Sequence, residues 1–376
     1  MTFSGFSHTF EEDPVSFQHT REISITNTLD SHRKAHPVVI PLAQLRERIP
    51  DFNECCFRLK HKPFTFEPLD IPAQVHTIPG RTGRGPELVF QVDLGPKDMV
   101  TVELQYNENG DDLPDYPDRT QSFGTWYRDG SNCAWENEIC GYRYYFGKID
   151  WFGKSYPHLN LHELAPDSYH SERYWGENPF DVHKTSGLGG LGLIKDGKLT
   201  KCYGWPDEAD YTHTYRAHGG GPVCAGVTIT TDDTQSGKFL AEASATLFNN
   251  RYENWYTATS GQPGACISPG IRKFSDEHVT IDENAGYLFA WGMPVEKYGT
   301  TGIACVWNPS MYDGMYETED VRFPLLRPDA EGLVRYLTLG VWYRPSSGQP
   351  DDLEPIHKLV SRLSDEYRNP VDVKIL

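Results

Sequence analysis

Short runs of β-branched and aromatic residues recur along almost the whole 376-residue chain, and turn-forming residues separate them. Apolar and polar side chains alternate within most runs, as in a strand with one buried face, and Gly, Pro, Asn or Asp stands between successive runs. The sequence therefore predicts an all-β protein. The clearest runs are REISITN (21–27), ELVFQVDL (87–94), MVTVELQY (99–106), VCAGVTITT (223–231), KFLAEASATLF (238–248), GYLFAWGM (286–293), TGIACVW (301–307) and LVRYLTLGVWYR (333–344).

Helical periodicity is confined to three short stretches. They are Leu42–Ile49, the residues near Phe10–Val15, and Glu354–Asp365, where apolar residues recur at helical spacing. We therefore expect few, short helices in the all-β fold.

The acidic stretch Asn107–Arg119 contains Gly and Pro and cannot continue a strand. We expect residues 1–118 to form a small β-sandwich region, and residues 119–376 to form a large, supersandwich-like antiparallel β-sandwich that carries the functional site. The stretch has enough carboxylates to ligate calcium, but its spacing does not match a helix-loop-helix calcium site. The sequence favours a solvated connector.

The formal net charge of −18 at pH 7 repels phosphate backbones and anionic membrane surfaces. Nucleic acid and membrane partners are therefore not expected, whereas an acidic small ligand can still bind where arginines gather. No run of about 18 apolar residues occurs, and the amino terminus lacks the pattern of a signal peptide. These features predict a cytoplasmic protein, and they leave its oligomeric state open.

Cysteine and histidine spacing offers no metal or redox motif. The eight cysteines contain no C-x-x-C, which favours reduced, mostly buried thiols. None of the expected helices contains an H-x-x-x-H or H-E-x-x-H pattern, and the fourteen histidines are otherwise scattered, so neither a metal nor a cofactor is predicted, with a divalent metal as the alternative. The run GLGGLG (187–192) lacks the βαβ context of a dinucleotide fingerprint, and no Walker or G-x-S-x-G motif occurs.

Aromatic residues make up 13% of the chain, and flat rings suit both pleated sheets and sugar faces. The densest polar and aromatic stretch is 135–183. If its beginning forms one strand as far as residue 146, Trp135, Asn137, Arg143 and Tyr145 share a face. Arg143 and Tyr145 would then lie about 6–7 Å apart, and Asn137 about 20 Å from Arg143. The alternative is an outward Arg143 paired with a surface glutamate, with the tyrosines in the core.

Two further segments combine rings with titratable groups. Tyr169–Asp181 contains aromatic, charged and turn residues, which favours a surface loop that forms part of a site over a loop folded under a sheet. The second segment is Tyr211–His218. Gly219–Gly221 follows it and allows a close approach of the backbone. In that second segment, alternation places Tyr211, His213, Tyr215 and Ala217 on one face and Thr212, Thr214, Arg216 and His218 on the other.

A series of short motifs occurs in a fixed order: IPAQV, ELVFQVDLGP, WEN, GYRYYFG, YH, GLGG, IKDGKL, GGGPV and a final GVWY strand before a terminal helix. Over nearly the whole chain, this series resembles the domain of unknown function 4861 family. Members occur in bacterial polysaccharide-utilisation gene sets, and one type is an ulvan oligosaccharide dehydratase. That type removes water from a non-reducing-end glucuronate and leaves a 4,5-unsaturated uronyl sugar. The resemblance implies a large β-sandwich and carries over Trp135, Glu136, Asn137, Arg143, Tyr169, His170 and Asp181.

Two loops depart from the family pattern. Residues 79–85 read PGRTGRG, where the family commonly has an acidic loop before the ELVFQVDL-like strand. Residues 171–180 read SERYWGENPF, where the family loop is rich in Glu, Asp and His. We therefore expect substrate choice to differ from that of other members.

Together these observations predict a carbon–oxygen lyase that acts on uronic-acid oligosaccharides by β-elimination between C4 and C5. Arg143 would neutralise the substrate carboxylate. His170 and Tyr169 would serve as base and acid, in either order, with His218, His213 or Tyr215 as substitutes. The predicted substrate-binding residues are Trp135, Glu136, Asn137, Tyr145, Arg173, Trp175, Asp181, His213 and Arg216.

Three alternatives remain at this stage. A polysaccharide lyase would expel a sugar rather than water, and a non-catalytic carbohydrate-binding protein would need only the aromatic platforms. A glycoside hydrolase would need two facing carboxylates. Its candidates are Glu136, Glu138, Glu172, Glu177 and Asp181.

Overall fold

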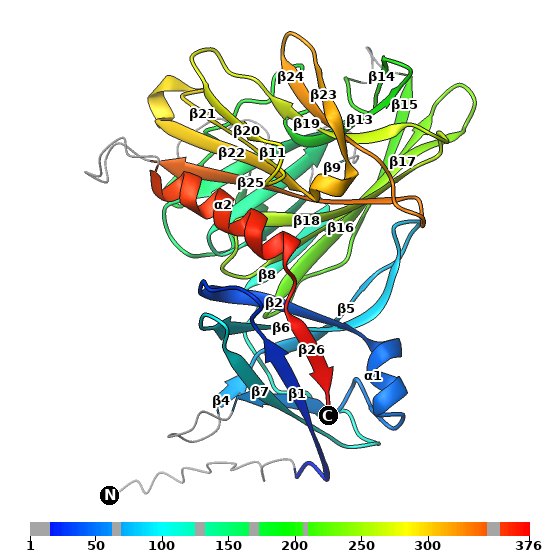
Figure 1. Ribbon diagram of the computed structural model, residues 1–376, viewed down its shortest axis with the longest axis vertical. Coiled ribbons are helices and arrows are strands. Elements are labelled where there is room, and N and C mark those ends of the chain that lie inside the picture. The colour runs from blue at the N-terminus through cyan, green and yellow to red at the C-terminus, as the bar shows by residue number, and fades with distance from the viewer. Residues whose placement is uncertain (1–15, 62–68, 125–131, 165–172, 206–209, 344–353) are drawn as a thin grey trace, which may run out of the picture.

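The computed structural model describes residues 16–61, 69–124, 132–164, 173–205, 210–343 and 354–376. Antiparallel sheets make up most of its regular structure, which confirms the predicted all-β class (Figure 1). The described residues contain two α-helices, α1 (Leu42–Arg48) and α2 (Glu354–Arg368), at two of the three predicted positions. Neither of them is long and apolar enough to cross a membrane. The third predicted helix, near Phe10–Val15, lies outside the described residues.

The small sandwich packs a five-stranded sheet, in the order β26-β1-β7-β3-β4, against a three-stranded sheet, β2-β6-β5. Alternate residues of both sheets form its core, and α1 adds Leu42 and Leu45 to it. The strands are β1 (His19–Thr26), β2 (Arg33–Pro41), β3 (Phe57–His61), β4 (Leu69–Ile71), β5 (Ala73–Ile78), β6 (Arg84–Leu94), β7 (Met99–Tyr106) and β26 (Asp372–Ile375).

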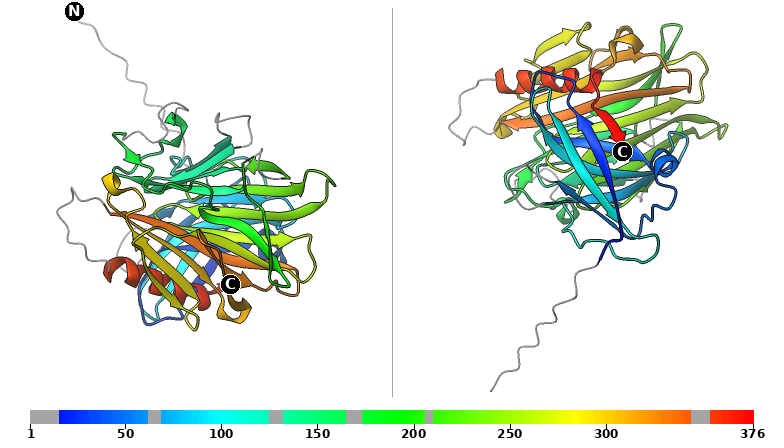
Figure 2. Two further views of the ribbon diagram at one scale, coloured as in Figure 1. Left: turned by 90° about the horizontal axis from the view of Figure 1, so that it is seen from above. Right: turned by 60° about the horizontal axis from the view of Figure 1, so that its bottom comes forward.

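The last strand of the chain completes the first sheet. β26 pairs antiparallel with β1, from Ile23 opposite Ile375 to Thr26 opposite Asp372, and the red strand lies beside the blue one in Figures 1 and 2. Val373 and Ile375 pack against the small core, which gives this pairing its apolar contact. We propose a division of the chain near residue 118. Because β26 pairs with β1, the small sandwich then also includes β26 from the end of the chain.

The large sandwich opposes an eight-stranded sheet to two five-stranded sheets. Its β8–β12 sheet has the order β12-β11-β10-β9-β8, and its β13–β24 sheet has the order β14-β13-β19-β24-β23. A parallel bridge between Ile149 and Gly187 links these two sheets into one layer. Their strands are β8 (Thr120–Gly124), β9 (Asn132–Asn137), β10 (Cys140–Tyr145), β11 (Lys148–Lys154), β12 (Gly176–Glu177), β13 (Leu188–Lys195), β14 (Lys198–Lys201), β19 (Cys266–Arg272), β23 (Tyr312–Glu317) and β24 (Val321–Leu326).

The eight-stranded sheet has the order β15-β16-β17-β18-β25-β22-β21-β20 and supplies the other half of the core. All eight cysteines are free and six are buried, which confirms the prediction of reduced core thiols. The helix α2 packs Ile356, Val360 and Leu363 on the opposite face of this sheet (Figures 1 and 2). The strands are β15 (Tyr211–Ala217), β16 (Cys224–Asp233), β17 (Phe239–Phe248), β18 (Glu253–Ser260), β20 (His278–Asp282), β21 (Tyr287–Gly292), β22 (Thr300–Trp307) and β25 (Leu333–Tyr343), and short 3-10 turns occur at Leu161–Glu163, Glu296–Tyr298 and Pro309–Met311.

A buried charged junction ties the two sandwiches and α2 together. Arg251 donates to Glu253 Oε1 at 2.5 Å, to Glu366 Oε2 at 3.0 Å and to the Lys34 carbonyl at 2.8 Å. The Nδ1 atom of His36, from the small sandwich, lies 3.6 Å from the same Glu366 oxygen. One guanidinium thus contacts β18, α2 and β2, so the junction depends on its charge pairs as well as on apolar packing.

The stretch 135–146 is a hairpin, and the expectation of a single strand is wrong. The Oδ1 atom of Asn137 accepts the backbone N–H groups of Ile139 and Cys140 at 2.9 Å each, and this side-chain-mediated turn reverses the chain. Trp135 therefore lies opposite Tyr142 in the pairing of β9 with β10. The chain therefore reverses between Trp135 and Arg143, and these two residues do not share a face. The separation of about 20 Å between Asn137 and Arg143, which assumed one extended strand, does not hold either.

Candidate functional site

Three buried cations gather on the outer face of the β8–β12 sheet, which faces away from the eight-stranded sheet. Trp135 and Tyr142 point into the core, so Arg143, the next residue along β10, points outward. Lys148 lies on β11 and Arg272 at the end of β19, and the exposed fractions of the three residues are 2%, 0% and 8%. We call Arg143, Lys148 and Arg272 the cation cluster.

Aromatic rings lie among these cations. The Arg143 guanidinium carbon lies 5.2 Å from the centre of the Tyr145 ring, and Lys148 Nζ lies 5.9 Å from it. Lys148 Nζ also lies 4.2 Å from the Trp205 ring and donates to the His183 carbonyl at 2.9 Å. The rings therefore offer flat apolar surface and a negative face to the cations in one place.

Two carboxylates accompany the cation cluster. Asp150 is the cross-strand neighbour of Arg143, and its Oδ2 accepts from Asn178 Nδ2 at 2.7 Å. Burial lowers the pKa of Arg272, while Asp181, Asp150 and the Tyr145 phenol act to raise it. These electrostatic contributions place β10, β11, β19 and the segment after β12 around one polar region.

The sequence-predicted residues Arg143, Tyr145 and Asp181 belong to this region. Asp181 is half-buried, and its carboxylate accepts the His183 backbone N–H at 3.1 Å and approaches His183 Nε2 at 2.9 Å. Tyr169 and His170 lie outside the described residues. Several segments therefore set the local charge at Arg143. Arg143 points outward but is only 2% exposed, so the alternative of a surface pair with a glutamate does not describe it.

Glu136 serves the structure of this face. It is fully buried, forms an ion pair with Lys154, and accepts the backbone N–H groups of Asn160 and Leu161 at 3.0 and 2.8 Å. Gln121 also donates to it at 2.5 Å. Glu136 thus fixes the short turn at Leu161–Glu163 against the sheet.

Arg173 and Trp175 fold back onto the same sheet. Trp175 is 1% exposed and packs with Phe152 and Leu161, so its ring is interior packing. Arg173 donates to the Glu163 carbonyl at 3.3 Å. Together these contacts attach the segment after residue 172 to the turn before residue 165.

Trp135 lies on the opposite face of the sheet from Arg143, and Asn137 lies at the turn that follows β9. Trp135 is fully buried, stacks on Tyr142 with ring centres 5.8 Å apart, and donates to Asn254 Oδ1 at 2.7 Å. Asn137 Nδ2 donates to the Phe248 and Arg251 carbonyls at 2.7 and 2.6 Å. These contacts are structural, and the β8–β12 sheet separates Trp135 from the cation cluster.

The predicted β15 residues form a second, separate group. The expected alternation is present, since Tyr211, His213, Tyr215 and Ala217 are half-buried, whereas Thr212, Thr214 and Arg216 are exposed. His213 packs edge-on against Tyr144, a core-facing residue, and burial lowers its pKa to about 4. His218 lies farther along and contacts Thr228 Oγ1 at 2.7 Å, with its ring centre 6.5 Å from that of His76. Neither histidine shares a face with Arg143.

Sequence reasoning missed several residues of this region. Lys148 and Asp150 lie on alternate positions of β11, and continuing the strand pattern past the hairpin would have placed them beside Arg143 and Tyr145. Arg272 gave no local signal, because only the long-range pairing of β13 with β19 brings it to this place.

Comparison with known proteins identifies the family and the fold. A protein in the glycosyl hydrolase family 38 from Enterococcus faecalis is 8% identical, with a TM-score of 0.50, and the match covers 95% of this chain and 47% of that one. An alpha-mannosidase from Enterococcus faecalis V583 is also 8% identical, with a TM-score of 0.48 and coverage of 95% and 46%. This chain thus spans about half the length of these structures, and the first likeness shows the fold alone.

Sequence comparisons give one family and no individual relative. No curated protein matches the chain. The family model named domain of unknown function (DUF4861) matches residues 25–373, nearly the whole chain. The chain therefore belongs to the DUF4861 family.

Proposed function

We propose that this protein is an enzyme that acts on oligosaccharides bearing a uronic acid, and that the cation cluster receives the uronate carboxylate. The observation that carries the proposal is the convergence of Arg143 and Lys148 on the Tyr145 ring, with Arg272 in electrostatic range of the same ring. Cations supply charge-assisted hydrogen bonds to a carboxylate, and rings suit the apolar face of a pyranose.

The burial of the cations supports an acidic ligand. Placing three cations inside a protein is costly unless negative groups lie near them. Asp150 and Asp181 supply negative charge near Arg272, and a uronate carboxylate would be a further negative group in this region. The net charge of −18 belongs to the molecule as a whole, so this local arrangement gives an acidic sugar one receptive place.

The proposed reaction is a β-elimination across C4 and C5 of the uronate. Neutralising the carboxylate makes the C5 proton more acidic, a base removes that proton, and the C4–O bond breaks as an acid protonates the leaving oxygen. The products are a 4,5-unsaturated uronyl residue and water. His170 and Tyr169 are the proposed base and acid, in either order, and both lie outside the described residues.

A carboxylate pair for hydrolysis is less well supported. Glu136 is paired with Lys154, and Glu138 accepts Arg119 Nη1 with both oxygens at 2.9 Å. These contacts engage two of the five candidates of the hydrolase alternative. Because a similar structure is a glycosyl hydrolase family 38 protein, glycoside hydrolysis is the competing outcome of the test.

The test is incubation with a panel of uronic-acid oligosaccharides, read by mass spectrometry and by the absorbance of a conjugated unsaturated uronate. A dehydratase lowers the mass by one water and keeps the chain length. Arg143→Gln and Lys148→Met should each lower kcat/KM at least about 100-fold, whereas the exposed Arg335→Gln should not. A chain split with gain of water would favour a hydrolase. Full activity in both site variants would remove the cation cluster from the mechanism.

A further inference from the structure

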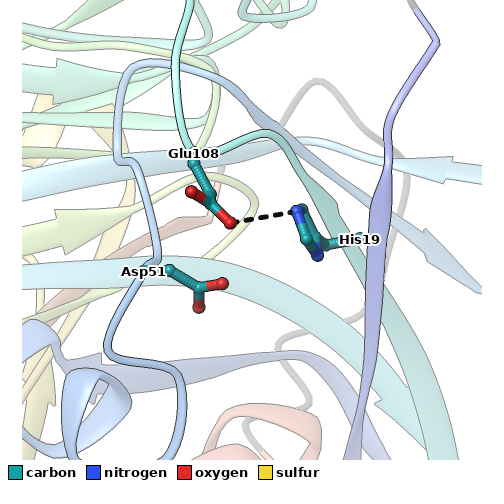
Figure 3. A group of neighbouring side chains, drawn as sticks. All are labelled: His19, Asp51 and Glu108. Atoms are coloured by element: carbon teal, nitrogen blue, oxygen red, sulfur yellow. Dashed lines mark ion pairs between the residues drawn. The ribbon is translucent and has the colours of Figure 1, made fainter.

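Three donor side chains of the small sandwich meet at its surface, far from the cation cluster in the fold. His19 lies at the start of β1, Asp51 follows α1, and Glu108 is the second residue of the acidic stretch Asn107–Arg119 after β7 (Figure 3). One ligand atom of each lies within 4.8 Å of those of the other two. We propose that His19, Asp51 and Glu108 bind a first-row transition metal dication, with Zn²⁺ as the best match.

The spacing of the donors supports this assignment. Four ligands at about 2.1 Å around a tetrahedral Zn²⁺ lie roughly 3.4 Å from one another. His19 Nε2 lies 3.4 Å from Glu108 Oε1, the pair joined by the dashed line in Figure 3. The Asp51 carboxylate is exposed, so its side chain can rotate toward the other two donors. Three protein ligands would leave a fourth position for water.

The donor chemistry selects the class of ion. Calcium and magnesium prefer oxygen ligands, whereas an imidazole nitrogen beside two carboxylates suits zinc and its neighbours. The acidic stretch alone offers carboxylate oxygens, which suit Ca²⁺, whereas His19 adds a nitrogen donor. The imidazole makes Zn²⁺ a better candidate than Ca²⁺.

Neighbouring contacts hold the three segments in place without the ion. Tyr106 donates to Asp51 Oδ1 at 2.9 Å, and its ring stacks on His19 with centres 5.0 Å apart. Asn107 accepts the Gln18 N–H at 2.8 Å, beside His19, and donates its own N–H to the Cys56 carbonyl at 3.1 Å. Such supporting contacts orient metal ligands and preform a site.

A bound ion would have a structural consequence at this place. Glu108 starts the stretch that leads from the small sandwich to β8 in the large one. An ion held by His19, Asp51 and Glu108 would fasten this connection to β1 and to the segment after α1. This proposed metal site is independent of the proposed enzymatic activity.

The competing explanation is a simple ion pair between a protonated His19 and Glu108, and zinc titration separates the two. The full chain is stripped with a chelator and titrated with Zn²⁺ by calorimetry in a non-coordinating buffer. His19→Ala and Glu108→Gln should each weaken binding at least about tenfold. His32→Ala changes an exposed histidine of the same sandwich outside the cluster and should bind zinc as the wild type does.

Three further readings decide the outcome. X-ray absorption of the zinc complex should show one imidazole nitrogen, and His19→Ala should lose it. Circular dichroism establishes that the variants are folded, and the melting temperature of the wild type should rise with zinc. Absence of zinc binding, binding that both variants retain, or tighter binding of Ca²⁺ than of Zn²⁺ would each overturn the proposal.

Discussion

Replacing Glu366 with glutamine tests the charged junction between the two sandwiches. Glu366 is 4% exposed, and its Oε2 accepts from Arg251 at 3.0 Å and lies 3.6 Å from His36 Nδ1. Burial by itself raises the pKa of Glu366. The approach of His36 and the charge of Arg251 outweigh burial and lower this pKa from 4.5 to about 2.

The size of the effect follows from that difference. The interval between 4.5 and about 2 corresponds to about 3 kcal/mol, because each pH unit is worth a little more than 1 kcal/mol. Arg251 keeps Glu253 as a second partner, at 2.5 Å, when Glu366 loses its charge. We therefore expect Glu366→Gln to lower the free energy of unfolding at pH 7 by about 2–3 kcal/mol.

The same lowered pKa fixes the sign of the pH dependence. A carboxyl group whose pKa is lower in the folded than in the unfolded state stabilises the fold above the unfolded value. This stabilisation is lost as the pH falls through the folded value, so the window for Glu366 runs from 4.5 down to about 2. By this linkage about 1 kcal/mol of the contribution remains at pH 3. The difference between wild type and variant should therefore shrink by more than half between pH 7 and pH 3.

Urea unfolding at pH 7 and pH 3, followed by tryptophan fluorescence and far-ultraviolet circular dichroism, measures both quantities. Glu331→Gln is the matched control, because the Glu331 side chain is 72% exposed in its pair with Arg335. This control should stay within about 0.5 kcal/mol of the wild type. An equal loss at both pH values for Glu366→Gln, or a loss at pH 7 no larger than the control's, would refute the electrostatic reasoning.

Three other perturbations test the packing. Gly220→Ala should lower the free energy of unfolding by at least about 3 kcal/mol, because its Cβ would lie 2.0 Å from the Thr120 carbonyl oxygen, while Gly85→Ala, with open space, should unfold much like the wild type in the same thermal melts. Asn137→Ala should lose about 2–4 kcal/mol of stability, because four backbone hydrogen bonds depend on this side chain; an unchanged melting temperature would contradict its structural role. Since burial lowers the pKa of His213 to about 4, the fold should lose stability as the pH falls from 6.5 toward 4, and His213→Gln should reduce that loss in melts at pH 7 and pH 4.5.

Local alternation predicted the two faces of β15, a strand outside the cation cluster. Alternation in β15 placed His213 and Tyr215 on the half-buried face and Arg216 outside, as the structure has them. The same rule put Trp135 on the face of Arg143, which is wrong, because the turn between them depends on one side chain, Asn137, that accepts two backbone N–H groups. Strand alternation contains no information about such a turn.

The sequence by itself determined the all-β class, both described helices, and the reduced cysteines, since each depends on spacing within a few residues. It also determined that Arg143 and Tyr145 are near neighbours on one strand. Only the tertiary structure decided that Lys148 and Arg272 join them, that Trp135 lies on the other side of the sheet, and that β26 returns to β1. Those arrangements follow from pairings between strands far apart in the chain, where many weak contacts act together and no local pattern records the partner.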